Sequence, residues 1–127
     1  MKRPEQALQR AVARYLELAL PREAWFTAFP AGGGGKVRGA ILKGMGLKPG
    51  VPDLLILHHG ELYGIELKAS GGRLSPEQGE CHRSMARAGC QGIAVCKSVD
   101  DVAVVLREWR ILGGKPGPLG GEARATA

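Results

Sequence analysis

The chain has 127 residues, of which 44% are hydrophobic, and this suits one domain with a single core. Its formal net charge is +6 and its pI is about 9.6, a basic surplus that favours a polyanionic partner. The aromatic fraction is only 5%, which argues against a stacking platform for single-stranded nucleic acid. No apolar run approaches the length needed to cross a bilayer, so we expect no membrane association.

The three cysteines, Cys81, Cys90 and Cys96, are odd in number and show no CxxC spacing. This pattern argues against a disulfide framework and against a zinc site. We interpret them as reduced thiols, which are typical of a cytoplasmic protein.

A helix is predicted from Pro4 onward, because apolar residues recur at helical spacing. They are Leu8, Val12, Tyr15, Leu16 and Ala19. Glu5 falls on the same stripe. It either complements the helix dipole in the first turn or points from the end of the buried face toward a site. Periodicity alone favours the dipole.

Residues 25–29 are predicted to form a short strand that ends at Pro30. A flexible glycine-rich loop follows at 31–35, with a short possible helix over 37–43. Cations surround this segment: Lys36, Arg38, Lys43 and Lys48. They suit a loop that grips a phosphate backbone and suit a solvated surface loop equally well.

Two apolar runs, 53–58 and 62–68, flank His59-Gly60 and indicate a β-hairpin. Ser75-Pro76 then begins a helix that is expected to run to about Ala88, with Gly89 as its C-terminal cap.

The apolar run 93–96 is predicted to be a strand buried on both faces. Ser98 begins a last helix whose buried stripe is Val102, Val105, Leu106 and Trp109. Glycine, proline and alanine dominate 113–127, which we predict to be a disordered tail after a domain spanning 1–112. The order of elements predicts an α/β sandwich with a mixed sheet.

The hairpin's register brings charged residues together. If His59-Gly60 is a two-residue turn, His58 faces Glu61 and, further along the strands, Asp53 faces Glu66. Directly opposed side chains share a face, with Cβ atoms roughly 4.5–5.5 Å apart. Lys68 lies two residues beyond Glu66 and therefore shares that face.

Two opposed carboxylates repel each other unless a cation neutralises them. Hard carboxylate oxygens suit Mg²⁺ or Mn²⁺, so Asp53 and Glu66 are candidate metal ligands. The alternative is that Asp53 ends a turn while Glu66 and Lys68 belong to a solvated strand face, which is ordinary in a hairpin.

Gln78 also has two interpretations. With Ser75 it fits a capping box, which by itself explains both residues. It also lies on the apolar face of the helix, so it can look inward toward the hairpin, and His82 one turn later can join it.

Three segments in this order resemble the VRR-NUC family, which belongs to the PD-(D/E)xK nuclease superfamily. They are Gly50-Val51-Pro52-Asp53, Ile65-Glu66-Leu67-Lys68 and Leu74-Ser75-Pro76-Glu77-Gln78. The resemblance extends upstream through Lys43-Gly44-Met45-Gly46-Leu47-Lys48 and weakly to Glu5-Gln6-Ala7-Leu8-Gln9. It implies a restriction-endonuclease-like αβββαβα core with a central mixed sheet flanked by helices.

The resemblance implies a divalent-metal-dependent phosphodiesterase that uses Mg²⁺ or Mn²⁺. Asp53, Glu66 and the backbone carbonyl of Leu67 are expected to bind metal, and Lys68 to orient the attacking water. Glu5 and Gln78 are expected to complete the site. Related nucleases often carry an aromatic residue where this chain has His82.

The minimal members of the family, typical of phages and bacteria, resemble Holliday junction resolvases, so the expected activity is hydrolysis of DNA. The resemblance also implies that the protein acts as a homodimer. Such a protein works in the cytoplasm of a bacterial cell or a phage-infected host. Cations expected to hold the DNA backbone are Lys36, Arg38, Lys43, Lys48 and Arg73. Structure-selective cutting is expected, since no helix is rich in base-reading side chains. The alternatives are a non-catalytic DNA-binding module and a purely structural protein.

Overall fold

The computed structural model describes residues 3–29 and 35–112. The predicted disordered tail at 113–127 lies outside these residues, as does nearly all of the predicted glycine-rich loop. Within the described ranges no helix is both long and apolar enough to cross a membrane.

Eight elements make up the described chain, and the sequence predicted each of them to within about two residues. In chain order they are α1 (Arg3–Ala19), β1 (Ala24–Ala28), α2 (Gly35–Gly44), β2 (Leu54–His58), β3 (Glu61–Leu67), α3 (Pro76–Arg87), β4 (Gly92–Cys96) and α4 (Val99–Glu108). The possible short helix is present as α2, inserted between the first two strands of the expected αβββαβα core.

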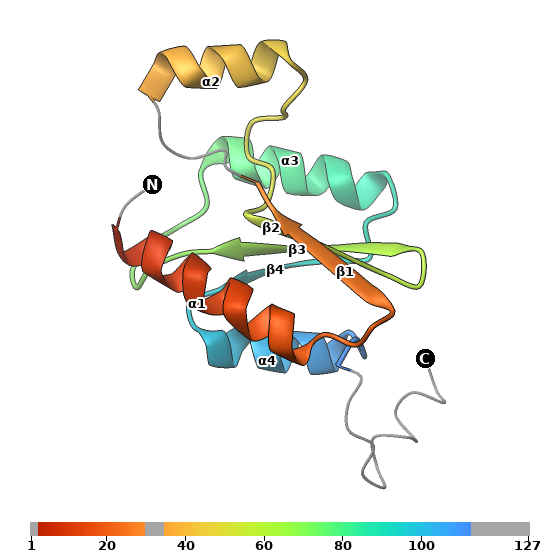
Figure 1. Ribbon diagram of the computed structural model, residues 1–127. Coiled ribbons are helices and arrows are strands. Elements are labelled where there is room, and N and C mark those ends of the chain that lie inside the picture. Colours follow the sequence, from red (N-terminus) through yellow and green to blue (C-terminus); the bar gives the residue numbers. More distant parts are fainter. Residues whose placement is uncertain (1–2, 30–34, 113–127) are drawn as a thin grey trace, which may run out of the picture.

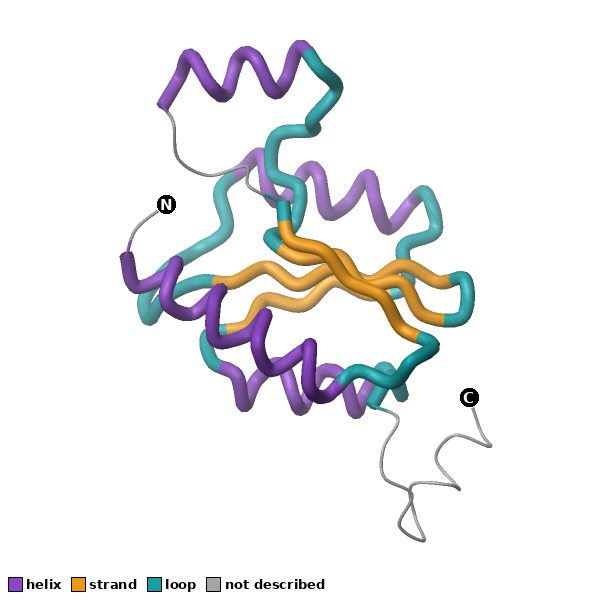
Figure 2. The backbone as a smooth tube through the Cα atoms, viewed as in Figure 1, coloured by secondary structure: helices purple, strands orange, loops and turns teal. Residues whose placement is uncertain are grey.

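The four strands form one mixed sheet in the order β1-β2-β3-β4. The β1–β2 and β2–β3 pairs are antiparallel, whereas β3 and β4 are parallel because α3 carries the chain back across the sheet. Helices α1 and α4 cover one face and α3 lies over the other (Figure 1). The tube view shows the same layers around the strands (Figure 2). The predicted α/β class is confirmed.

The core lies between the sheet and the α1–α4 layer. Alternate residues of the hairpin strands point into it, as a period of two requires: Leu54 and Ile56 from β2, Ile65 and Leu67 from β3. From the helices come Val12, Leu16, Val102 and Leu106, all fully buried. The opposite face of the hairpin, which bears Glu66, is therefore turned toward α3.

The expectation that the fourth strand is buried on both faces is wrong. β4 is an edge strand, and the side chain of Val95 is 44% exposed. Its continuous apolar run is typical of a central strand, but only the face that bears Cys96 packs against the core.

Helix α2 stands apart from the rest of the molecule (Figure 1). None of its residues is buried, and Val37 and Ile41 are 75% and 57% exposed. Core packing within the described residues therefore contributes little to this helix.

Candidate active site

The hairpin has the register that the sequence predicts. His59 and Gly60 form its turn with φ values of 51° and 80°, the two positive angles of a type I′ turn. The ladder then pairs His58 with Glu61 and Leu54 with Ile65. One step further along the strands, Asp53 is level with Glu66.

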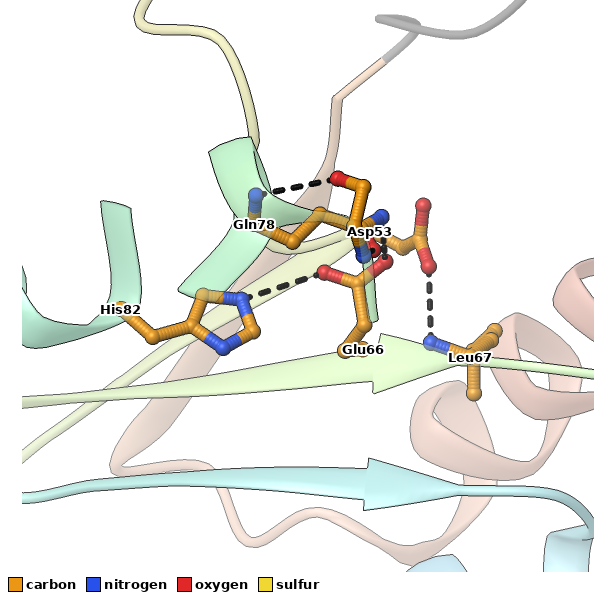
Figure 3. Close-up of polar contacts among 6 residues, drawn as sticks. Asp53, Glu66, Leu67, Gln78 and His82 are labelled. Carbon is orange, nitrogen blue, oxygen red and sulfur yellow. Dashed lines mark hydrogen bonds and ion pairs between the residues drawn. The ribbon is translucent and has the colours of Figure 1, made fainter. Parts of the chain in front are cut away.

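Asp53 is tied to the end of β3 by its carboxylate. Its Oδ2 accepts a hydrogen bond from the backbone N–H of Leu67 at 2.7 Å (Figure 3). Its own carbonyl accepts from the N–H of Phe29 at 3.0 Å, which continues the pairing with β1. The side chain is therefore fixed beside the Glu66–Leu67 peptide, on strands rather than on a free loop.

Two glycines allow the segment before Asp53 to pack closely. Pro52 is buried against Gly64 of β3, where a Cβ would lie 2.9 Å from Pro52 Cγ. Gly50 has φ +86° and touches the first turn of α3, where a Cβ would lie 2.7 Å from Gln78 Cα. The segment leading to Asp53 is thus held between the hairpin and α3.

Glu66 is the one buried charged residue among the described core residues, with a side chain only 2% exposed. Burial raises its pKa to about 8, and the neighbouring charge of Asp53, a hydrogen bond to Asp53 and the charge of Glu5 act in the same direction. The Lys68 cation opposes this rise. The site therefore gathers more negative charge than its own lysine offsets.

Both carboxylate oxygens of Glu66 face side chains of α3. Gln78 Nε2 donates to Oε2 at 3.0 Å, and His82 Nε2 lies 3.3 Å from Oε1 (Figure 3). Gln78 also completes a capping box, since its Oε1 accepts from Ser75 N–H at 2.8 Å and its N–H donates to Ser75 Oγ at 3.1 Å. Gln78 therefore both caps α3, through Oε1, and points inward to the hairpin, through Nε2.

Lys68 and Glu5 border the same site. Lys68 follows β3, is partly buried, and its N–H donates to the carbonyl of Cys96 at 3.0 Å. Glu5 Oε2 accepts from the N–H of Ala69 at 3.5 Å, so the first turn of α1 reaches the end of β3. Glu5 therefore points toward the site as well as lying in the first turn.

The five predicted DNA-contacting cations are all exposed, and none of them is among the charges that shift the pKa of Glu66. Lys36, Arg38 and Lys43 lie on α2, and Arg73 lies in the connection between β3 and α3. Lys48 lines a hollow beside α3 together with Pro49 and Met85. These five cations therefore come from three different segments of the described chain.

The sequence pattern did not decide whether His82 contacts the site. Its spacing from Gln78, four positions along one helix, is the signal that places both side chains on one face. Because a lone histidine on a helix is usually structural, only the tertiary packing brings its ring to Glu66.

The donor set fits Mg²⁺ or Mn²⁺ better than zinc. In residues 3–29 and 35–112 no group of three or more histidine, cysteine, aspartate and glutamate side chains has an arrangement that can hold a metal. Mg²⁺ keeps several waters and needs only one or two carboxylates, which Asp53 and Glu66 supply.

Fold and site define an α/β protein with an acidic pair and a lysine at the end of a hairpin. A solved structure described as a VRR_NUC domain protein has a TM-score of 0.65 with this chain at 23% identity, covering 86% of this chain and 89% of that one. A second, described as a VRR_NUC domain, has a TM-score of 0.56 at 18% identity, covering 84% and 97%. No family model and no curated protein matches. The chain has the fold of VRR-NUC domains, the family that its motifs resemble.

Proposed function

We propose that this chain is a VRR-NUC-type endonuclease that hydrolyses DNA phosphodiester bonds with Mg²⁺ or Mn²⁺. The observation that supports it best is the buried Glu66 carboxylate, level with Asp53 and held near Lys68 at the end of one hairpin. A buried carboxylate beside a second, partly buried one costs stability, so the presence of Glu66 next to Asp53 favours a functional site.

Asp53 and Glu66 would hold the metal through their side chains, and Leu67 through its backbone carbonyl. The N–H of Leu67 points to Asp53, and the N–H and C=O of one strand residue face the same neighbouring strand. The bound ion would polarise the phosphate and lower the pKa of a water.

The chain's own residues do the remaining work. Lys68, next to Glu66, is the one cation among the charges acting on that carboxylate, and its ammonium would orient the attacking water and stabilise charge on the phosphate. Gln78 anchors one oxygen of the Glu66 carboxylate through its hydrogen bond to Oε2. Glu5 adds negative charge at the rim of the site, which strengthens its attraction for a cation.

The experiment compares cleavage of linear, flapped and four-way DNA by the protein and by Lys68→Ala, with Mg²⁺, Mn²⁺ or EDTA. We expect metal-dependent cleavage that the substitution reduces by roughly 100-fold or more, as loss of a charge-stabilising group does. Equal cleavage by both proteins would show that this site is not responsible.

The second candidate is a non-catalytic DNA-binding module of the same fold. The exposed cations on α2 support it, because they suit phosphate contacts and need no metal. It predicts salt-sensitive DNA binding, no calorimetric signal on titration with Mn²⁺, and no cleavage.

We further propose that the substrate is branched DNA, such as a junction, and that two copies act together in the cytoplasm. Lys36, Arg38, Lys43, Lys48 and Arg73 would hold the DNA backbone without reading bases. The exposed apolar residues of α2 support an association between copies, and its test is given at the scale of the whole molecule below.

A further inference from the structure

His82 is a nearly buried histidine in contact with the site, and the proposed function gives it no role. Its side chain is 13% exposed, and its Nε2 lies 3.3 Å from Glu66 Oε1. Figure 3 shows the ring approaching the carboxylate from α3, beside Gln78. The contact joins residues sixteen positions apart, so it is a tertiary contact and not a local one.

Two side chains of α3 contact different oxygens of the Glu66 carboxylate. Gln78 contacts Oε2 and His82 contacts Oε1, and their spacing of four residues places both side chains on one face of α3. The terminal torsion of a glutamate is broad, so one hydrogen bond leaves the carboxylate free to turn about it. A second contact on the other oxygen fixes its plane.

Helix α3 is rigidly attached at the end that carries these residues. Its capping box closes the first turn, and the close approach of Gly50 to Gln78 presses that turn against the segment leading to Asp53. His82 follows one turn later. Because this end of α3 is held in place, the contact with His82 also holds the Glu66 carboxylate in place.

This role needs a neutral ring with its proton on Nε2. Burial and the Lys68 cation lower the pKa of His82, while Asp53 opposes the change. A neutral imidazole carries one N–H, which can face the carboxylate from Nε2.

We propose that His82 is a positioning residue that donates from Nε2–H to Glu66 Oε1 and, with Gln78, holds the carboxylate in the orientation that binds the divalent cation. This inference rests on the proposed function. Gln78 and His82 would then be hydrogen-bond partners of a metal ligand. In other proteins, loss of one such partner lowers metal affinity roughly 10- to 100-fold.

Three substitutions separate the hydrogen bond from the packing. His82→Gln places an amide N–H near the position of Nε2, His82→Asn carries a donor that is too short, and His82→Met fills the space without a donor. Glutamine and methionine are both good helix formers, so α3 is expected to persist. Arg83→Gln, an exposed neighbour on the same helix, is the control.

The first measurement is Mn²⁺ affinity by calorimetry, with thermal unfolding of each variant alongside. We expect His82→Met and His82→Asn to bind roughly 10-fold more weakly, and His82→Gln to stay within about 3-fold of the wild type. Unchanged affinity in His82→Met, or an equal loss in His82→Gln, would overturn the inference. A wild-type protein that binds no Mn²⁺ would overturn the proposed function and this role with it.

The second measurement needs neither metal nor activity. Long-range ¹H–¹⁵N spectra of the metal-free protein at alkaline pH report which ring nitrogen carries the proton. We expect the His82 proton on Nε2 in the wild type and a mixture of tautomers in Glu66→Ala. A wild-type ring protonated on Nδ1 would contradict the hydrogen bond, even in a protein that cleaves DNA.

Discussion

Glu66 combines two properties that rarely meet in one residue. It interrupts the apolar part of β3, and its side chain is almost completely buried. Its raised pKa means that the folded, metal-free chain binds a proton at Glu66 more tightly than the unfolded chain does. By linkage, this group stabilises the fold most at low pH, and its contribution is lost as the pH rises through about 8.

The metal-free protein should therefore melt at a lower temperature near pH 9 than near pH 5, and Glu66→Gln should flatten this dependence by several degrees. Each unit of pKa difference corresponds to about 1.4 kcal/mol. Thermal unfolding in EDTA at the two pH values measures the effect. Mn²⁺ should restore the wild type near pH 9 and leave Glu66→Gln nearly unchanged. Parallel pH dependences in both proteins would mean that Glu66 titrates normally.

Helix α3 is the element on which the site depends most. It supplies the Gln78 and His82 contacts to the Glu66 oxygens, and its first turn packs against the backbone of Gly50. The close approach leaves no room for a side chain at this position. The strand segment and the helix are therefore coupled through a glycine that makes no polar contact with the site.

Gly50→Ala should destabilise the protein by at least about 2 kcal/mol, because it adds a clash with α3 to the cost of a positive φ. It should also weaken Mn²⁺ binding, since α3 must move away from the hairpin. Denaturant unfolding and calorimetry measure the two effects.

Gly46→Ala is the matched control. Gly46 also has a positive φ, +105°, but open space surrounds its Cβ position. It should show only the backbone cost, roughly 1–2 kcal/mol. If both variants lose the same stability and keep the same metal affinity, the contact at Gly50 does not position the site.

At the scale of the whole molecule, packing within the described part of the chain does not explain the exposed apolar residues of α2. Its apolar residues Val37 and Ile41 continue to Met45 just beyond it, one helical turn apart, and all three are more than half exposed. A ten-residue helix is marginal in water without a surface to pack on. A second copy offers such a surface, as the proposed homodimer requires.

Light scattering during size exclusion should give the mass of a dimer for the wild type and that of a monomer for Ile41→Glu, because a charge cannot be buried unpaired in the interface. Leu18→Glu, at an 82% exposed position on α1, is the control and should remain dimeric. A monomeric wild type at micromolar concentration would contradict the proposal.

The sequence by itself determined every feature that depends on local rules. A two-residue turn at His59-Gly60 fixes the pairing of β2 with β3, so Asp53 had to lie level with Glu66. Helical periodicity and the capping box located the helices, and the order of elements predicted the mixed sheet.

Only the tertiary structure decided what depends on contacts between distant segments. Glu5 and His82 belong to different helices, and no periodicity states which end of the sheet each helix approaches. The exposure of Val95 depends on which strand lies at the edge, and the high pKa of Glu66 depends on the burial that α3 completes. Hydrophobic pattern and turn chemistry are local, whereas burial and charge coupling arise only when the elements pack.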